Sequence, residues 1–129
     1  MLIDMSTECF VSLEIAKLLN ENGFKEKTDY IFFYYEEDGG WCFEKLLPED
    51  KFDEKKMLRC PTHQSVMSWF RKNHHIHILP WISDPSQLNP KYYCVIWDTS
   101  KTESHIIELF NSYEEACEES IKYCLENMI

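Results

Sequence analysis

The sequence contains little glycine, relatively few basic residues and no long hydrophobic run. With only 3 glycines in 129 residues, it has neither a dinucleotide-binding G-x-G-x-x-G motif nor a Walker-type phosphate loop. A hydrophobic content of 44% excludes a disordered or fibrous chain. No apolar stretch approaches the roughly 20 residues that span a membrane, and residues 1–5 lack the positive charge of a secretory signal. We therefore expect a soluble protein of the cytoplasm with no membrane partner.

The length corresponds to one domain, and no internal repeat or linker divides the chain. A chain of 129 residues buries roughly two thirds of its unfolded surface around a single core. The expectation is one α+β domain over residues 1–129.

Acidic residues outnumber basic ones by 23 to 13, which gives a formal net charge of −10. Such a field repels phosphate backbones, and no run of Lys or Arg along the sequence would neutralise several phosphates. Residues 62–129 have the α-β-β-β-α order of a double-stranded RNA-binding domain, but glutamates occupy positions 114, 115, 118 and 119 at the start of the last helix, where such domains place lysines. Direct nucleic-acid binding is therefore not expected.

The six cysteines are scattered singly, mostly among apolar residues. Cys94 lies in a strand-like run, and Cys117 and Cys124 are two helical turns apart on one apolar face. In a reducing compartment this pattern favours free, buried thiols over a disulfide framework.

Hydrophobic periodicity predicts three helices and five strands. The helices begin after Ser12, at Thr62 and after Ser112, which forms an S-x-x-E capping box with Glu115. The first helix is expected to end at Gly23, and Tyr113 is expected on the apolar stripe of the last helix. The expected strands cover residues 30–35, 41–43, 75–80, 92–97 and 105–110, and residues 46–60 are expected to form a surface loop with room for one short helical turn. The resulting order, α-β-β-α-β-β-β-α, predicts an α+β fold with a mainly antiparallel sheet packed against helices.

The histidines form the one cluster that suggests metal binding. His74, His75 and His77 read H-H-x-H, and Cys60 and His63 form a C-x-x-H pair. A zinc site needs three or four converging ligands, usually in two short-spaced pairs, and the second pair is missing. In a strand, His75 and His77 would share one face. We expect no metal and no cofactor.

Catalytic groups are equally sparse. Cys60 with His63 or His77 is a conceivable nucleophile–base pair, but no oxyanion loop accompanies it, and Glu36, Glu37 and Asp38 beside a hairpin turn are ordinary solvated acids. The sequence predicts that the protein is not an enzyme.

Aromatic residues make up 15% of the chain, and the strand over residues 30–35 is apolar on both faces. One face can meet helices, and the other must be covered by a loop, a second copy or a partner. Trp81, at a strand end, is of a type enriched in interface hot spots. Tyr30, Phe32, Tyr34 and Trp81 are therefore the candidate interaction surface, unless all these rings pack into a single core.

Three blocks resemble a family of small uncharacterised proteins of gut Bacteroidetes, their phages and mobile elements. The blocks are residues 10–24, residues 60–78 with P-T-H and W-F-R followed by I-H-I, and residues 112–116 with S-Y-E-E-A. Phe70 stands where the family more often has Leu. The resemblance implies no catalytic residue, and it favours a phage-related accessory or host-interacting protein.

Two functions follow as hypotheses. The first is a non-enzymatic intracellular interaction or accessory protein that contacts a protein partner or forms a homodimer. The alternative is an acidic, nucleic-acid-mimicking inhibitor of a DNA- or RNA-handling enzyme, suggested by the net charge and by the glutamates of the last helix.

Overall fold

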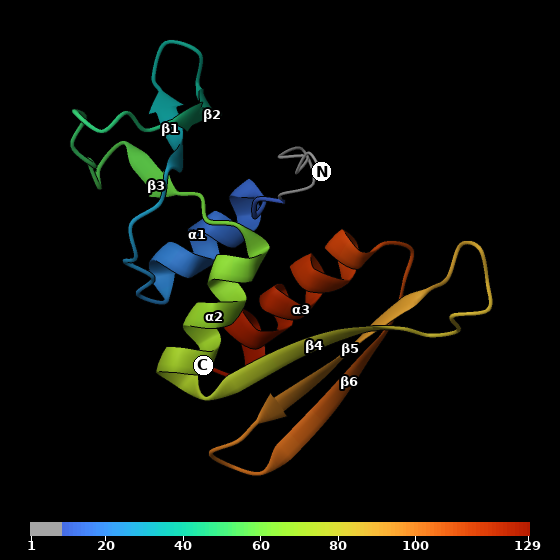
Figure 1. Ribbon diagram of the computed structural model, residues 1–129. Helices are drawn as coiled ribbons and strands as arrows, with labels where there is room; N and C mark the ends of the chain where they lie inside the picture. The colour runs from blue at the N-terminus through green and yellow to red at the C-terminus, as the bar shows by residue number, and fades with distance from the viewer. Residues whose placement is uncertain (1–8) are drawn as a thin grey trace. The chain divides into compact units, whose positions relative to one another are not determined.

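The computed structural model describes residues 9–129, so the segment in which we expect no secretory signal lies outside the described residues. Antiparallel strands and three helices confirm the α+β class (Figure 1). The elements in chain order are α1 (Leu13–Glu21), β1 (Tyr30–Tyr35), β2 (Gly40–Lys45), β3 (Met57–Arg59), α2 (His63–His74), β4 (Ile76–Ile82), β5 (Tyr92–Asp98), β6 (Glu103–Phe110) and α3 (Tyr113–Asn127).

The chain divides into two compact units, and the boundary lies between Thr62 and His63. The first unit contains α1 and a sheet in the order β2-β1-β3, and the second contains α2, α3 and a sheet in the order β4-β5-β6. The strands thus form two three-stranded sheets rather than one. The single domain over residues 1–129 stays a prediction.

In the first unit, β1 is the central strand and pairs with β2 through a tight hairpin. Gly39 in the turn has a φ of 64°, a conformation that costs glycine little. The expectation of a loop throughout residues 46–60 is wrong, because β3 pairs with β1 on its other side. Three residues are too short to show a period, so β3 depends on the unpaired edge of β1 rather than on a local pattern.

Helix α1 begins and ends as its sequence predicts. The Ser12 side chain accepts a hydrogen bond from the Ile15 amide at 3.2 Å, and Gly23 just beyond the helix has a φ of 83°. Ile15, Ala16 and Leu19 form its buried face. The buried ring of Phe24 follows directly, with its backbone amide bonded to the Leu19 carbonyl at 3.0 Å.

In the second unit, both helices lie on the same side of the β4-β5-β6 sheet (Figure 1). The strand residues that face them are fully buried, among them Ile76, Ile78, Cys94 and Ile96. From α2, the buried set is His63, Val66, Met67, Trp69 and Phe70. From α3, it is Ala116, Cys117, Ser120, Ile121, Cys124 and Leu125.

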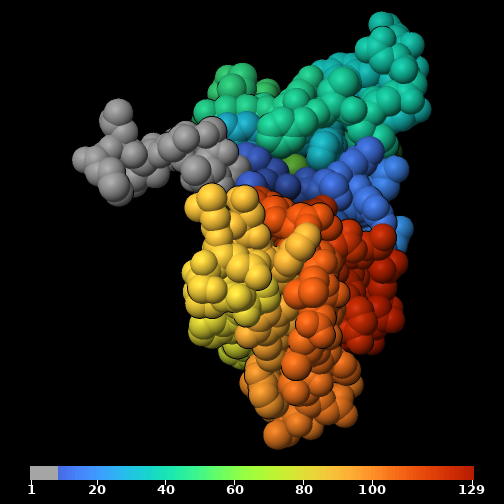
Figure 2. Space-filling view, turned by 90° about the vertical axis from the view of Figure 1, so that its right-hand side faces the viewer, coloured from blue at the N-terminus to red at the C-terminus, as the bar shows by residue number. Residues whose placement is uncertain are grey.

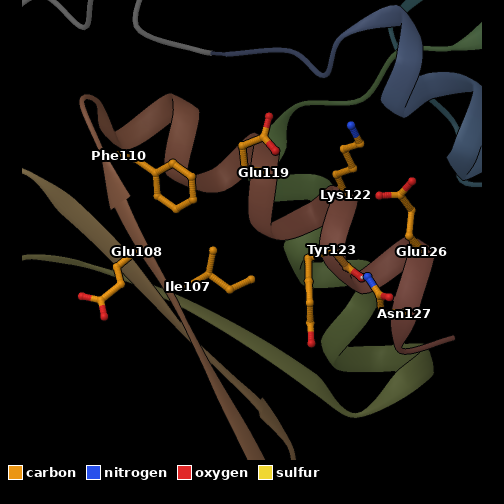
Figure 3. A pocket seen from close by; sticks show the side chains of 8 residues that line it. All are labelled: Ile107, Glu108, Phe110, Glu119, Lys122, Tyr123, Glu126 and Asn127. Atoms are coloured by element: carbon orange, nitrogen blue, oxygen red, sulfur yellow. The ribbon is translucent and has the colours of Figure 1, made fainter.

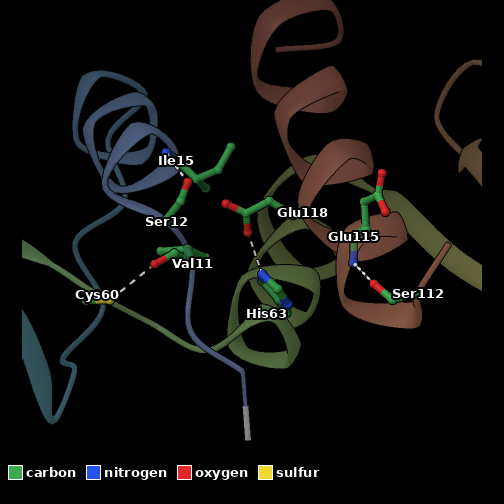
Figure 4. A network of polar contacts seen from close by, with 8 residues as sticks. All are labelled: Val11, Ser12, Ile15, Cys60, His63, Ser112, Glu115 and Glu118. Atoms are coloured by element: carbon green, nitrogen blue, oxygen red, sulfur yellow. Dashed lines mark hydrogen bonds and ion pairs between the residues drawn. The ribbon is translucent and has the colours of Figure 1, made fainter. Parts of the chain in front are cut away.

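Helix α3 begins at the predicted N-cap. The Ser112 side chain accepts from the Glu115 amide at 3.1 Å (Figure 4). The Glu115 carboxylate accepts from the Asn111 amide, one residue before the capping-box position. Tyr113, expected on the apolar stripe, is 37% exposed instead. It occupies the first helical position, where its hydroxyl reaches α2 and accepts from the Gln64 amide at 2.9 Å.

His75 does not begin β4, which corrects the expectation that it shares a strand face with His77. It has a φ of 56° and forms the junction between α2 and β4, in the left-handed conformation that often ends a helix. Its carbonyl accepts from both the backbone amide and the hydroxyl of Thr99, at 3.0 and 3.1 Å. The helix therefore stops here through a backbone turn that hydrophobic alternation does not reveal.

The N-cap of α3 is tested by the substitution Ser112→Ala. Because the Glu115 amide then loses its acceptor, we expect the free energy of unfolding to fall by about 1 kcal/mol. Urea denaturation followed by circular dichroism measures the change. Ser104→Ala, at an exposed strand position, serves as the control, and equal losses in the two variants would contradict the cap.

Asp98 predicts a pH dependence of stability. Its carboxylate accepts from the Ser100 hydroxyl at 2.6 Å, from the Ser100 amide at 3.0 Å and from the Lys101 amide at 3.3 Å. The Ser100 hydroxyl contributes most to holding the pKa of Asp98 below its usual value. A depressed folded-state pKa stabilises the protein above the ordinary aspartate pKa of about 3.9, and this stabilisation is lost as the pH falls through the folded-state value.

We therefore expect Asp98→Asn to be less stable than the wild type at pH 7, on the order of 1 kcal/mol, and the difference to shrink as the pH falls below about 4. Urea denaturation between pH 7 and pH 3 measures this convergence. Asp50→Asn, in an exposed loop, is the control. A difference between Asp98→Asn and the wild type that persists at low pH would contradict the role of the charge.

Candidate interaction surface

Tyr30, Phe32 and Tyr34 lie on one face of β1, where they contact other rings of the first unit. The register places Phe43 opposite Phe32 and Trp41 opposite Tyr34. Tyr30 stacks parallel to Phe43 with ring centroids 5.0 Å apart, and Tyr34 lies 5.2 Å from Trp41. All three predicted residues are half-buried. They form a packed aromatic cluster with their neighbours rather than a bare surface.

Trp81, the fourth predicted residue, lies on β4 in the second unit and is 57% exposed. It belongs to the sheet face that turns away from α2 and α3. We call this surface the open sheet face. The strand register arranges its side chains in three rows, which are His77–Trp97–Ser104, Leu79–Val95–Ile106 and Trp81–Tyr93–Glu108.

The open sheet face is apolar and largely exposed. Its central row is aliphatic, with Leu79 41% and Ile106 64% exposed, and Trp97 beside this row is 40% exposed. Glu108, at one corner, is its one acidic group. Within residues 63–129, all of which the structure describes, no helix lies against this face. Contiguous apolar exposure of this kind marks a contact site more often than scattered apolar residues do.

Both edges of this sheet are protected against pairing with another strand. On the β4 edge, Pro80 has no amide hydrogen to donate. On the β6 edge, the register shifts opposite Tyr92 and Tyr93, which interrupts the regular ladder. A partner would therefore approach the face of the sheet rather than its edges.

Most residues of the open sheet face could not be singled out from the sequence. Tyr93, Val95 and Trp97 alternate along β5, but the residues between them are apolar as well, so the pattern does not tell which set is buried. Ile106 follows the same alternation in β6. Only the cross-strand register brings these residues beside Trp81.

His63, His74 and the candidate nucleophile Cys60 have structural partners. The His63 Nε2 atom lies 2.5 Å from the Glu118 carboxylate, which joins α2 to α3 (Figure 4). The Cys60 thiol is buried and donates to the Val11 carbonyl at 3.5 Å. Burial lowers the pKa of His74, whose ring packs against Trp69 with centroids 4.8 Å apart. In the part of the chain that the structure describes, no group of three His, Cys, Asp or Glu residues could hold a metal ion.

A pocket of ≈ 370 Å³ lies between β6 and α3 (Figure 3). Figure 2 shows these two elements side by side at the surface of the second unit, β6 in orange and α3 in red. Glu119 and Glu126 line the pocket, and Lys122 lies between them along the helix. The Tyr123 ring packs against His105 with centroids 5.8 Å apart. With three glutamates and one lysine in its lining, the pocket gives this side of the unit an acidic character.

Comparison of the chain with protein-family models, with curated proteins and with solved structures gave no match. Among residues 9–129, no helix is long and apolar enough to cross a membrane.

All six cysteines are thiols rather than members of disulfides, and they differ strongly in exposure. Cys60, Cys94, Cys117 and Cys124 are buried, Cys9 is half-buried and Cys42 is exposed. Burial raises the pKa of the Cys124 thiol to about 12 and also raises that of Cys94. Because the thiolate is the reactive form, we expect these two thiols to be unreactive in the folded protein.

We expect iodoacetamide at pH 8 to modify Cys42 first and Cys9 more slowly in the native protein, since reaction requires access and a thiolate. The four buried cysteines should react only in denaturant. Mass spectrometry of tryptic peptides measures each site, and a denatured sample is the control. Rapid native modification of Cys94 or Cys124 would contradict the packing around α3.

Proposed function

We propose that this protein is a non-enzymatic interaction or accessory protein of the cytoplasm, and that it acts by associating with a second copy of itself through the open sheet face. The supporting observation is the row of Leu79, Val95 and Ile106, flanked by Trp81 and Trp97, which no helix of its own unit covers. A phage-related origin, which the sequence resemblance favours, is part of this proposal.

The charge distribution restricts a second copy to the open sheet face. Two chains of net charge −10 repel each other over most of their surface. The open sheet face is the exception, because Glu108 at its corner is the one acid among nine side chains. Two copies could therefore approach face to face with their carboxylates outside the apolar centre.

The size of the face supports a reversible dimer. Its exposed side-chain area is roughly 400–500 Å² per copy, given that a buried aromatic side chain accounts for 150–250 Å². Two copies would bury roughly 900 Å² in total, which is typical of weak or transient interfaces. Face-to-face packing of antiparallel sheets is a common geometry, and it needs no free strand edge.

Salt dependence distinguishes this association from other kinds. Screening reduces the repulsion between the two acidic chains and leaves the apolar contact in place. Self-association should therefore strengthen with salt. A complex with a basic nucleic-acid enzyme, as in the acidic-mimic alternative, would weaken instead.

Sedimentation velocity at increasing protein concentration, in about 20 mM and about 500 mM NaCl (roughly 20 Å and 4 Å of Debye screening length), tests the proposal. We expect a monomer–dimer equilibrium with more dimer at high salt. Ile106→Lys should reduce dimerisation at least tenfold because it places a charge in the central row, and such a loss corresponds to about 1.4 kcal/mol.

Leu88→Lys is the matched control, since it makes the same type of change at a loop residue that is 94% exposed and lies outside the open sheet face. It should dimerise like the wild type. A wild type that stays monomeric at every concentration and both salt levels would overturn the proposed self-association. Equal behaviour of the two lysine variants would overturn the assignment of the face.

A further inference from the structure

Three positively charged side chains of this acidic protein converge on one small pocket of the first unit. Lys25, Lys27 and Arg59 line it together with Thr28, Leu46 and Phe52. The lysines precede β1 and the arginine ends β3, so the fold joins cations that are more than thirty residues apart in the sequence. We propose that this pocket, which we call the cationic pocket, binds the phosphate group of a small phosphate monoester.

Arg59 is the best-placed of the three cations. Its side chain is only 17% exposed, and its guanidinium lies 4.1 Å from the centroid of the Phe52 ring. Stacking on an aromatic face holds the guanidinium plane in one orientation. A guanidinium fixed in this way can donate two parallel hydrogen bonds to one oxyanion, which a mobile surface arginine does less well.

The existing partner of these cations only partly neutralises them. One Glu54 oxygen lies 3.5 Å from the Lys25 amine and 4.0 Å from the Arg59 guanidinium, and its side chain is 62% exposed. Glu54 thus shows that an anionic oxygen can be shared between two of the cations. A single solvated carboxylate leaves net positive charge among Lys25, Lys27 and Arg59.

The dimensions and the lining favour a phosphate group. The pocket has a volume of ≈ 160 Å³, several times the roughly 30 Å³ that one water molecule occupies in the liquid, so it has room for a phosphate group and for part of the ester attached to it. Its doubly charged form matches an excess of cations better than one carboxylate does, and Leu46 and Phe52 offer an apolar wall to the carbon part of a monoester.

Heteronuclear NMR titration of the full chain tests the proposal with inorganic phosphate, phenyl phosphate and benzoate, at constant ionic strength. We expect saturable shifts of the amides of residues 25–28, 52 and 59 with inorganic phosphate. Phenyl phosphate should bind more tightly because its ring can contact the apolar wall. Benzoate, with the same ring and a single charge, should bind at least about tenfold more weakly than phenyl phosphate.

Three variants locate the binding site. Lys27→Gln, at an exposed position, should weaken phosphate binding severalfold, and Arg59→Gln should weaken it about tenfold or more because a charged fork is lost. Glu54→Gln should strengthen binding severalfold, since it removes the competing carboxylate, and a gain of affinity cannot arise from misfolding. Lys72→Gln, an exposed change of the same charge in the second unit, should leave binding unchanged.

Unsaturable shifts, or shifts that Lys27→Gln and Glu54→Gln leave as they are in the wild type, would overturn the site even if Arg59→Gln fails to fold. Equal affinities for benzoate and phenyl phosphate would overturn the choice of phosphate over carboxylate. These outcomes are independent of dimerisation, because the cationic pocket and the open sheet face belong to different units and are probed by different variants.

Discussion

The second unit depends on the packing of α3 against the central strand β5. Cys94 and Ile96 of β5 are fully buried, and the Cys94 thiol donates to the Ala116 carbonyl of α3 at 3.4 Å. Because side chains alternate along a strand, burying this set turns Tyr93, Val95 and Trp97 to the opposite face. The same contact that builds the core therefore also creates the open sheet face.

Local chemistry accounts for the parts of the fold that the sequence predicts well. The caps at Ser12 and Ser112, the helix end at Gly23 and the hairpin turn at Gly39 each involve a few neighbouring residues. The parts that sequence reasoning missed depend on distant partners. Strand β3 forms because the edge of β1 opposite β2 is available for pairing. The strands form two separate sheets, and the sequence pattern does not show which strands pair. His75 ends α2 in a left-handed conformation that its residue type does not signal.

The same distinction applies to the candidate sites. Trp81 could be singled out by its residue type and its place at a strand end, whereas Ile106 becomes noteworthy only when the register sets it beside Val95. The three cations of the cationic pocket are unremarkable in the sequence, because acids lie next to both lysines. Burial and strand order are properties of the whole chain. They decide which apolar residues are exposed to solvent and which cations have too few acidic groups nearby to neutralise them.

The two candidate sites both differ from the acidic remainder of the chain, but in different ways: one is nearly uncharged and the other is positively charged. The open sheet face is almost uncharged, so contact there gains from apolar burial and is opposed by the net charge around it. The cationic pocket gains from Coulomb attraction, which salt weakens. Rising ionic strength should therefore favour one site and disfavour the other. An acidic chain can bind an anionic ligand only in a pocket where the fold brings several cations together. It can self-associate only through a face that carries few acidic residues.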